Sequence, residues 1–334
     1  MIISCVSTQP ASTLKAGNLR SIHIVARNLL MTAVQNSFGV TSRLVNIVLG
    51  IKPLANLAKH QARQMIIKRS EKIGVPWTKT VQELRSQDWS THLNIVQNPH
   101  LTYPDYYCCS FHAYEKGNLS WDAALEVEVA AYTVHARIWQ DAGKEGDPRL
   151  RSSYHDILKS QISDQPRDIL DVGCGVGLSS FTLQAVYPQA KITGLDLSPY
   201  FLAVAHYNSQ QRNTDINWVH AAAETTGLPD KSFDLVSIFL VCHELPQSVT
   251  KQIFREVRRL LRPNGHLAIM DMNPHSEIYA KMPPYILTLL KSTEPYLDQY
   301  FTLDIAQALV EGGFKAPTIT SNTHRHRTIV AQVN

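Results

Sequence analysis

Residues 169–183 read ILDVGCGVGLSSFTL. An apolar run reaches Asp171, three alternating glycines follow it, and an apolar-rich segment begins at Leu178. This order predicts a strand that turns sharply into a helix. Glycines allow the positive φ angles of such a turn and let a ligand lie against the backbone. A nicotinamide-binding loop would need a glycine where Leu178 stands, so the spacing disfavours that cofactor.

Downstream of this turn, strands and helices alternate in the way that is typical of a parallel sheet with crossover helices. We expect five such strands, near 168–172, 191–196, 216–221, 233–241 and 266–271. Two final strands, near 318–321 and 328–333, are expected to close the sheet as an antiparallel pair. The sequence therefore predicts an α/β fold, with a seven-stranded, doubly wound sheet and a helical N-terminal extension or lid.

The residues before this sheet divide into segments of different character. Residues 1–18 lack apolar periodicity and are expected to form a disordered leader. Residues 19–149 are mainly helical, and we interpret them as a substrate lid or a membrane-surface element. Within them, 141–149 contain two glycines and a proline and look like a linker. The sheet is expected to occupy residues 150–334.

Charge is distributed unevenly along the 334 residues. Residues 1–70 contain nine Lys or Arg and no acid, while the remainder carries 23 basic and 28 acidic residues. An acid-free, basic leader is typical of a membrane contact, a nucleic-acid contact or a targeting peptide. We interpret residues 19–70 as helices packed on the main domain, with peripheral membrane contact as the alternative. Few aromatic residues interleave the basic ones, so no nucleic acid is expected as a partner.

The cysteine content favours a reducing compartment. The chain has five cysteines, an odd number, and none of them forms a Cys-x-x-Cys pair. We therefore expect a cytoplasmic protein, with a plastid or a peripheral membrane surface as the alternative. The oligomeric state stays open.

Four motifs in order carry a family resemblance. They are DVGCGVG at 171–177, GLDLSP at 194–199, GLPDKSFDLV at 227–236 and RLLRPNG at 259–265. Together they resemble class I S-adenosylmethionine-dependent methyltransferases, in particular the type 11-like methyltransferase domain. The resemblance covers roughly residues 150–334 and implies a Rossmann-like sheet that binds S-adenosylmethionine as cofactor.

The resemblance also implies which residues bind that cofactor. Ligands of open α/β sheets lie at the carboxyl ends of the strands, where the glycine loop brings backbone N–H groups to the methionine part. Asp196 ends the second strand, where a carboxylate can accept both ribose hydroxyls. The expected cofactor-binding residues are Asp171, Gly173, Gly175, Gly177, Asp196, Leu197, Ala223, Glu224 and Leu240.

One position departs from the family pattern. Members often place an acid at the end of the third strand, where it bonds the adenine amino group, but alignment puts Ala222 there. Either backbone groups near Ala223 contact the adenine, or Glu224 supplies the acceptor.

Methyl transfer is an in-line displacement whose leaving thioether needs no acid, so the protein mainly aligns the reactants. A base is needed only when the acceptor must lose a proton. His243 is the best candidate for that base and Glu244 could orient it, because both follow the fourth strand. No metal site is expected, since no third ligand has suitable spacing. His324 and His326 alternate along a strand and are expected on its solvated face.

An aromatic stretch from Tyr103 to Trp121 resembles a pocket wall, or else packs between two domains. Its candidate substrate-side residues are Tyr107, His112, Tyr114 and Trp121. The sequence thus predicts a methyltransferase that acts on a small, apolar or aromatic acceptor by in-line transfer. The alternative is a catalytically inactive, methyltransferase-like binding or assembly protein.

Overall fold

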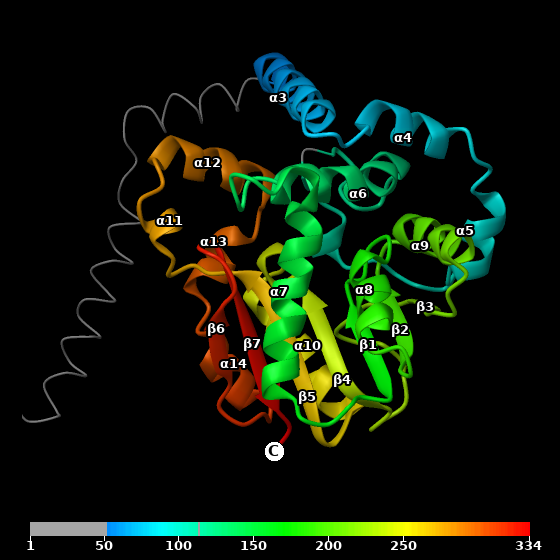
Figure 1. Ribbon diagram of the computed structural model, residues 1–334, viewed down its shortest axis with the longest axis vertical. Coiled ribbons are helices and arrows are strands. Elements are labelled where there is room, and N and C mark those ends of the chain that lie inside the picture. The colour runs from blue at the N-terminus through cyan, green and yellow to red at the C-terminus, as the bar shows by residue number, and fades with distance from the viewer. Residues whose placement is uncertain (1–51, 113) are drawn as a thin grey trace, which may run out of the picture.

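The computed structural model describes residues 52–112 and 114–334 of the chain (Figure 1). The leader expected at residues 1–18 and the helical pattern of residues 19–51 lie outside the described residues. In the described part, a seven-stranded sheet forms the centre of the molecule, and helices pack on both of its faces.

The sheet has the strand order β3-β2-β1-β4-β5-β7-β6. Strands β1 to β5 are parallel to their neighbours in that series, whereas β7 is antiparallel to both β5 and β6. This arrangement confirms the predicted doubly wound sheet with a closing antiparallel pair. The strands are β1 (Asp168–Val172), β2 (Lys191–Asp196), β3 (Asn217–His220), β4 (Phe233–Phe239), β5 (Leu261–Met272), β6 (Thr318–Ser321) and β7 (His326–Gln332).

Successive residues of β1 face opposite apolar layers, as the pleat of a strand requires. Ile169 packs in the layer under α7 and α8, while Leu170 packs in the layer under α10, α13 and α14, and both are fully buried. The sheet is therefore covered on both faces, which explains the continuous apolar runs of its strands. These helices are α7 (Gly146–Gln161), α8 (Leu178–Val186), α10 (Gln247–Leu260), α13 (Leu297–Thr302) and α14 (Ile305–Glu311).

A helical cap covers one end of the sheet (Figure 1). Two parts of the chain form this cap: the N-terminal helices and a segment between β5 and β6. Helices α5 and α6 of the cap pack against α9 (Pro199–Arg212). No helix of the described ranges is both long and apolar enough to cross a bilayer. The cap consists of α3 (Lys52–Lys72), α4 (Trp77–Arg85), α5 (Ser90–Val96), α6 (Trp121–His135), α11 (Glu277–Ala280) and α12 (Pro284–Thr293), with the segments that connect them.

The segment 141–149 is not the linker that its composition suggested. Helix α7 begins at Gly146, and a Cβ there would lie 2.4 Å from the carbonyl oxygen of His135. The buried carboxylate of Asp147 accepts hydrogen bonds from His135 Nδ1 at 2.7 Å and from Arg151 Nε at 2.8 Å. These buried hydrogen bonds stabilise a helical start of α7 despite the glycines and proline, and they hold the end of α6 against it.

The expectation for His326 is also wrong. Its side chain is not on a solvated face: the residue is only 7% exposed, on β7, with its ring 6.4 Å from that of His135. Burial, together with the nearby His135, lowers the pKa of His326 to about 3. His324 is exposed, but it lies in the bend before β7 and therefore shares no strand face with His326. His326 is buried because β7 lies between two other strands of a sheet that is covered on both faces.

Candidate functional site

The glycine loop at the end of β1 has the backbone geometry that the sequence predicted. Gly173, Gly175 and Gly177 all adopt left-handed conformations, with φ of 68°, 54° and 90°. A Cβ on Gly173 would lie 2.6 Å from the side chain of Val241, and one on Gly177 would lie 2.7 Å from Trp218. A Cβ on Gly175 would meet no atom of the described chain within 4 Å. The loop is therefore tightly packed at its two ends and open at Gly175.

Asp171 fastens this loop to the helix that follows it. Its Oδ2 accepts hydrogen bonds from the hydroxyls of Ser179 and Ser180, both at 2.6 Å, in the first turn of α8. Burial raises the pKa of Asp171 to about 6, while these two hydrogen bonds and the charge of Arg151 oppose the rise. Arg151 is a neighbour of the loop that the sequence did not reveal.

Asp196 lies across the loop, at the end of β2. Its Oδ2 accepts a hydrogen bond from the backbone N–H of Gly175 at 2.8 Å, and its Oδ1 accepts one from Ser198 N–H at 2.8 Å. The hydroxyl of Tyr107 also bonds this carboxylate, while burial raises the pKa of Asp196 to about 6. Asp196 is thus directly joined to the open part of the glycine loop.

The turn after β3 offers a carboxylate near the predicted adenine position. Glu224 Oε1 accepts a hydrogen bond from the hydroxyl of Tyr106 at 2.8 Å. Its Oε2 is buried and has no hydrogen-bond partner among the described residues. Such an acceptor fits an N–H donor like the adenine amino group, so the residues present suit the cofactor despite Ala222. Ala223 is half-buried beside it, and Leu197 is buried at the end of β2.

Leu240 redirects the chain at the end of β4. It has a φ of 59°, an uncommon value for a bulky residue, and its N–H donates to the carbonyl of Met270 at 2.8 Å. Strained backbone of this kind tends to occur at functional sites. Here it leads directly into the 3-10 turn Cys242–Glu244, which carries the two predicted catalytic residues.

Beyond this turn, five ionisable side chains from distant parts of the chain converge, and we call them the acid–histidine cluster. Its first pair joins His243 Nδ1 to Asp271 Oδ1 at 2.7 Å, and both residues are buried. Burial alone would lower the pKa of His243, but the Asp271 carboxylate outweighs it and raises that pKa to about 10. His243 is therefore cationic at neutral pH. The cluster consists of His112, His243, Glu244, Asp271 and Glu294.

The second part of the cluster is centred on His112. Its Nε2 lies 2.9 Å from Glu294 Oε1 and 3.7 Å from Glu244 Oε1. The backbone of His112 has a φ of 48°, and its N–H donates to the carbonyl of Thr293 at 3.1 Å. Burial raises the pKa of Glu244 to about 7, although the two histidines oppose the rise. Glu244 thus exchanges its proton near neutral pH.

Tyr107 lies between the cluster and the cofactor side. Burial raises the pKa of its hydroxyl well above the usual value, and the nearby carboxylates of Asp196 and Glu244 raise it further. The structure therefore brings together two of the four predicted substrate-side residues, Tyr107 and His112, near His243 and Glu244.

Tyr114 and Trp121 point elsewhere. The hydroxyl of Tyr114 donates to Glu126 Oε2 at 2.7 Å. Trp121 packs against Trp89 and Tyr200, with ring centroids 5.5 and 4.9 Å away. Their substrate roles stay predictions, since these contacts place both side chains within the packing of the cap.

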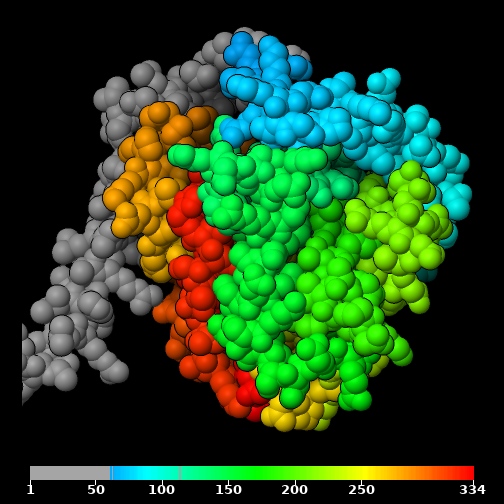
Figure 2. Space-filling model, in the orientation of Figure 1, coloured from blue at the N-terminus to red at the C-terminus, as the bar shows by residue number. Residues whose placement is uncertain are grey.

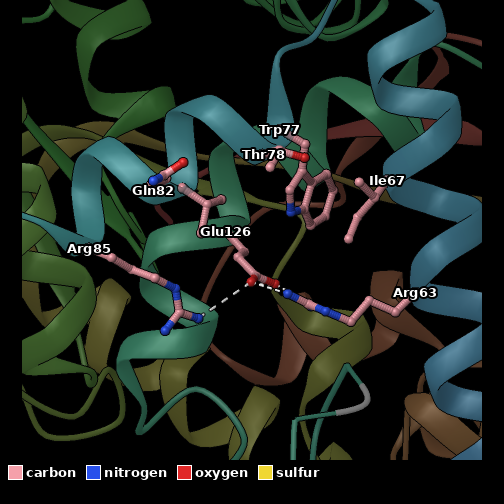
Figure 3. A pocket seen from close by; sticks show the side chains of 8 residues that line it. Arg63, Ile67, Trp77, Thr78, Gln82, Arg85 and Glu126 are labelled. Atoms are coloured by element: carbon pink, nitrogen blue, oxygen red, sulfur yellow. Dashed lines mark hydrogen bonds and ion pairs between the residues drawn. The ribbon is translucent and has the colours of Figure 1, made fainter.

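Figure 3 shows an ion pair between Arg63 and Glu126 that joins α3 to α6 in the cap. The fully buried Glu126 carboxylate is paired with Arg63 on α3, and Arg85 on α4 lies 3.8 Å away. Tyr114 is in turn joined to Phe111 by two backbone hydrogen bonds, of 2.8 and 3.1 Å, which close the turn that contains His112. The ion pair lines a cavity of about 240 Å³ together with Ile67, Trp77, Thr78, Val81 and Gln82.

The sequence alone did not identify several of these side chains as part of the site. Asp271 ends β5, next to β4, so an acid at that strand end was a usable signal. Tyr106, Glu294 and Glu126 have no spacing relation to any motif and are found only in the folded chain. Within the described ranges, no group of three or more His, Cys, Asp or Glu has the arrangement of a metal site.

Comparison with known proteins agrees with the geometry. Residues 169–265 match the model of a family described as a methyltransferase domain. A ubiquinone biosynthesis O-methyltransferase of Coxiella burnetii is 26% identical over 193 residues, which are 56% of this chain and 80% of that protein. A demethylmenaquinone methyltransferase of Listeria welshimeri is 32% identical over 118 residues, which are 35% of this chain and 49% of that protein.

Among solved structures, a SAM-dependent methyltransferase from Aquifex aeolicus is similar with a TM-score of 0.45 and 18% identity. The similarity covers 57% of this chain and 94% of that one. The matched family model, the similar sequences and the loop that holds Asp171 and Asp196 together identify the catalytic type. The chain therefore contains an S-adenosylmethionine-dependent methyltransferase domain.

Proposed function

We propose that this enzyme transfers a methyl group to a hydroxyl of a small, apolar or aromatic acceptor. When bound, S-adenosylmethionine supplies the electrophilic methyl group. The residues that would hold it are the glycine loop, Asp196 for the ribose hydroxyls and Glu224 for the adenine amino group. The relatives support this kind of acceptor, because their names place them in ubiquinone and menaquinone synthesis.

The observation that carries the proposal is the geometry of the acid–histidine cluster, in which Asp271 binds His243 at 2.7 Å and His112 lies 3.7 Å from Glu244. A hydroxyl acceptor must give up its proton as its oxygen gains the methyl group, so an oxygen acceptor benefits from a nearby base. His243 already holds a proton, because Asp271 raises its pKa to about 10. Glu244, with a pKa of about 7, is matched to accept a proton at neutral pH. We therefore assign the base to Glu244 and give His243 an electrostatic role.

His112 supports Glu244 in this assignment. Its Nε2 lies near the carboxylates of both Glu244 and Glu294, so a proton taken by Glu244 remains within a shared network. Tyr107 separates this network from Asp196 and would lie against the acceptor. The acceptor's apolar part would meet half-buried Tyr106 and Leu290, which pack on the apolar core beneath.

The inactive binding protein is the weaker alternative. Its sequence support was Ala222, which stands where relatives often place an adenine-binding acid. The buried and unpaired Oε2 of Glu224 offers such an acceptor two residues later. The departure at Ala222 therefore does not favour loss of activity.

The test is transfer of an isotopically labelled methyl group to a series of alkylated phenols and hydroquinones, with identification of the product. We expect labelled ethers, and kcat of the unaltered enzyme should rise as pH increases through about 7, where Glu244 loses its proton. Glu244→Gln should lower kcat and abolish this rise while leaving S-adenosylhomocysteine affinity unchanged. Glu277→Gln, at a highly exposed acid of the cap, is the matched control. Label on carbon or nitrogen, or an unaltered pH profile in Glu244→Gln, would contradict the proposal.

A further inference from the structure

Helix α12 has an apolar surface that the described residues leave exposed. Its sequence, PYILTLLKST, is almost devoid of charge, yet none of its ten residues is buried. Tyr285, Ile286 and Leu289 are 41%, 38% and 42% exposed. Single exposed apolar residues are ordinary, but several along one short helix are typical of an interaction site.

Helix α3 combines exposed apolar and basic residues. Met65 and Ile66 are 66% and 40% exposed. The helix carries six Lys or Arg against one acid, Glu71, and of these Lys68 and Lys72 are exposed. Arg63 is instead paired with Glu126. In the described part, nine large apolar residues are at least 38% exposed, and five of them lie on α3 and α12. The exposed apolar surface is therefore concentrated on these two helices of the cap.

The two helices lie at the same end of the molecule (Figure 1), and both contribute to its outer surface there (Figure 2). Helix α12 also leads directly into the acid–histidine cluster. The carbonyl of its last residue, Thr293, accepts the N–H of His112, and the next residue is Glu294. A molecule that enters past α12 would therefore arrive beside the proposed base.

We propose that α3 and α12 together form a surface that rests on an anionic lipid bilayer. Interfacial helices of this kind place apolar side chains at the boundary between headgroups and acyl chains, while Lys and Arg contact anionic headgroups. The reason for such a membrane contact rests on the proposed function: an apolar acceptor would dissolve in the bilayer and reach the acid–histidine cluster past α12. The contact itself depends on neither cofactor nor acceptor.

Charge favours a bilayer over a second copy of the chain as the occupant. In a symmetric dimer, the same patch from each subunit meets its copy, so two surfaces of net positive charge would face each other. An anionic lipid surface complements that charge, with each Lys or Arg near the membrane contributing roughly 1 kcal/mol.

The test is binding of the full chain, without cofactor or acceptor, to phosphatidylcholine vesicles with and without phosphatidylglycerol, measured by flotation. We expect binding to the anionic vesicles that weakens as salt increases. The double variant Ile286→Asp/Leu289→Asp and the double variant Met65→Asp/Ile66→Asp should each weaken it about ten-fold or more, since each removes two apolar side chains from the interface.

Val310→Asp is the matched control, because Val310 is 44% exposed but lies on α14, outside the cap. It should bind as the unaltered chain does, and unchanged S-adenosylhomocysteine binding in all variants would show that they fold. Absence of vesicle binding, an equal loss in Val310→Asp, or full binding by both double variants would overturn the proposal. A double variant that dissociates a dimer in sedimentation, with vesicle binding intact, would assign the surface to self-association instead. Methyl transfer to a water-soluble phenol tests the proposed function separately.

Discussion

The sheet and the cap hold their acids in different ways. At the sheet, Asp171 and Asp196 accept hydrogen bonds from Ser180 and Gly175, which are only 9 and 21 positions away along the chain. In the cap, Glu126 is held by a residue 63 positions away. The glycine loop and Asp196 are thus built from one local strand–turn–helix unit and its neighbouring strand, whereas Glu224 is bound by the distant Tyr106. The acid–histidine cluster instead needs the cap to be docked on the sheet.

This difference implies a division of labour. A site fixed by neighbouring residues is preorganised once the sheet has formed, whereas a site closed by distant segments depends on their packing. Changes at the glycine loop or Asp196 should therefore affect cofactor affinity. Changes in the cap should affect turnover and leave cofactor affinity almost intact.

The largest effect is expected at Asp196. Asp196→Ala removes the carboxylate that holds Gly175 N–H and that would accept the ribose hydroxyls. S-adenosylhomocysteine affinity, measured by calorimetry, should fall ten-fold or more, and each factor of ten corresponds to about 1.4 kcal/mol. Asp298→Ala is the control, because the Asp298 side chain is 67% exposed in α13. Unchanged affinity in Asp196→Ala would remove the cofactor assignment and with it the distinction between the two regions.

Protonation of Asp196 at acidic pH should weaken cofactor binding. The same protonation should not destabilise the fold. Burial raises the pKa of Asp196 to about 6, above the value of about 3.9 for an unfolded chain. Between these values the folded state binds more protons, so this group's contribution to the free energy of unfolding decreases as pH rises from about 4 to 6. Accepting ribose hydroxyls requires the ionised form, so the dependence of binding on pH has the opposite sign.

S-adenosylhomocysteine affinity should therefore fall about ten-fold between pH 7 and pH 5, as one carboxylate with a pKa near 6 becomes protonated. Calorimetric titrations across this range would measure the change, and thermal unfolding of the free enzyme would report stability at each pH. Asp196→Asn cannot titrate and should bind with a weaker dependence on pH. An affinity that does not vary from pH 7 to 5 would show that Asp196 stays ionised or does not contact the nucleoside.

The sheet could be predicted from the sequence because short, contiguous motifs specify its turns and strands. A glycine loop, an apolar strand before it and Asp196 a fixed distance later specify one turn geometry, and four such motifs in order specify the strand order. Glu294 could not be paired with His112 in this way, because the insertion of α11 and α12 after β5 brings these two residues together. Asp271 lies near the end of β5, beside β4, and its position there was the only local signal for its pairing with His243.

Composition misled where buried charges decided the outcome. Residues 141–149 contain two glycines and a proline, which usually mark a turn or linker. The buried carboxylate of Asp147 binds Arg151 and His135, and a helix through Gly146 satisfies all three groups at once. A charged pair inside a helix is invisible to apolar periodicity, so the start of α7 at Gly146 was not predicted.

The smallest predicted effect tests whether the cap positions the base. Glu126→Gln would weaken the pairing with Arg63 and the hydrogen bond that holds Tyr114, whose backbone closes the turn that presents His112. We expect kcat to fall several-fold and its pH midpoint to shift, because His112 would hold Glu244 less firmly. S-adenosylhomocysteine affinity should stay within about two-fold, since the described hydrogen bonds of Glu126 go to Arg63 and Tyr114 and none goes to the glycine loop.

Glu128→Gln is the control for this change, because Glu128 lies on the same helix and reaches Arg212, 4.0 Å away, rather than Tyr114. Its kcat and pH midpoint should match those of the unaltered enzyme. If Glu126→Gln lowers cofactor affinity as much as kcat, the cap and the sheet act as one unit. Cofactor binding and turnover would then not be divided between them. If neither quantity changes, the ion pair holds α3 to α6 without any influence on His112. A shifted pH midpoint at constant affinity is the one outcome that a purely structural anchor would not produce, because the pKa of Glu244 changes only if its burial, its neighbouring charges or its hydrogen bonds change.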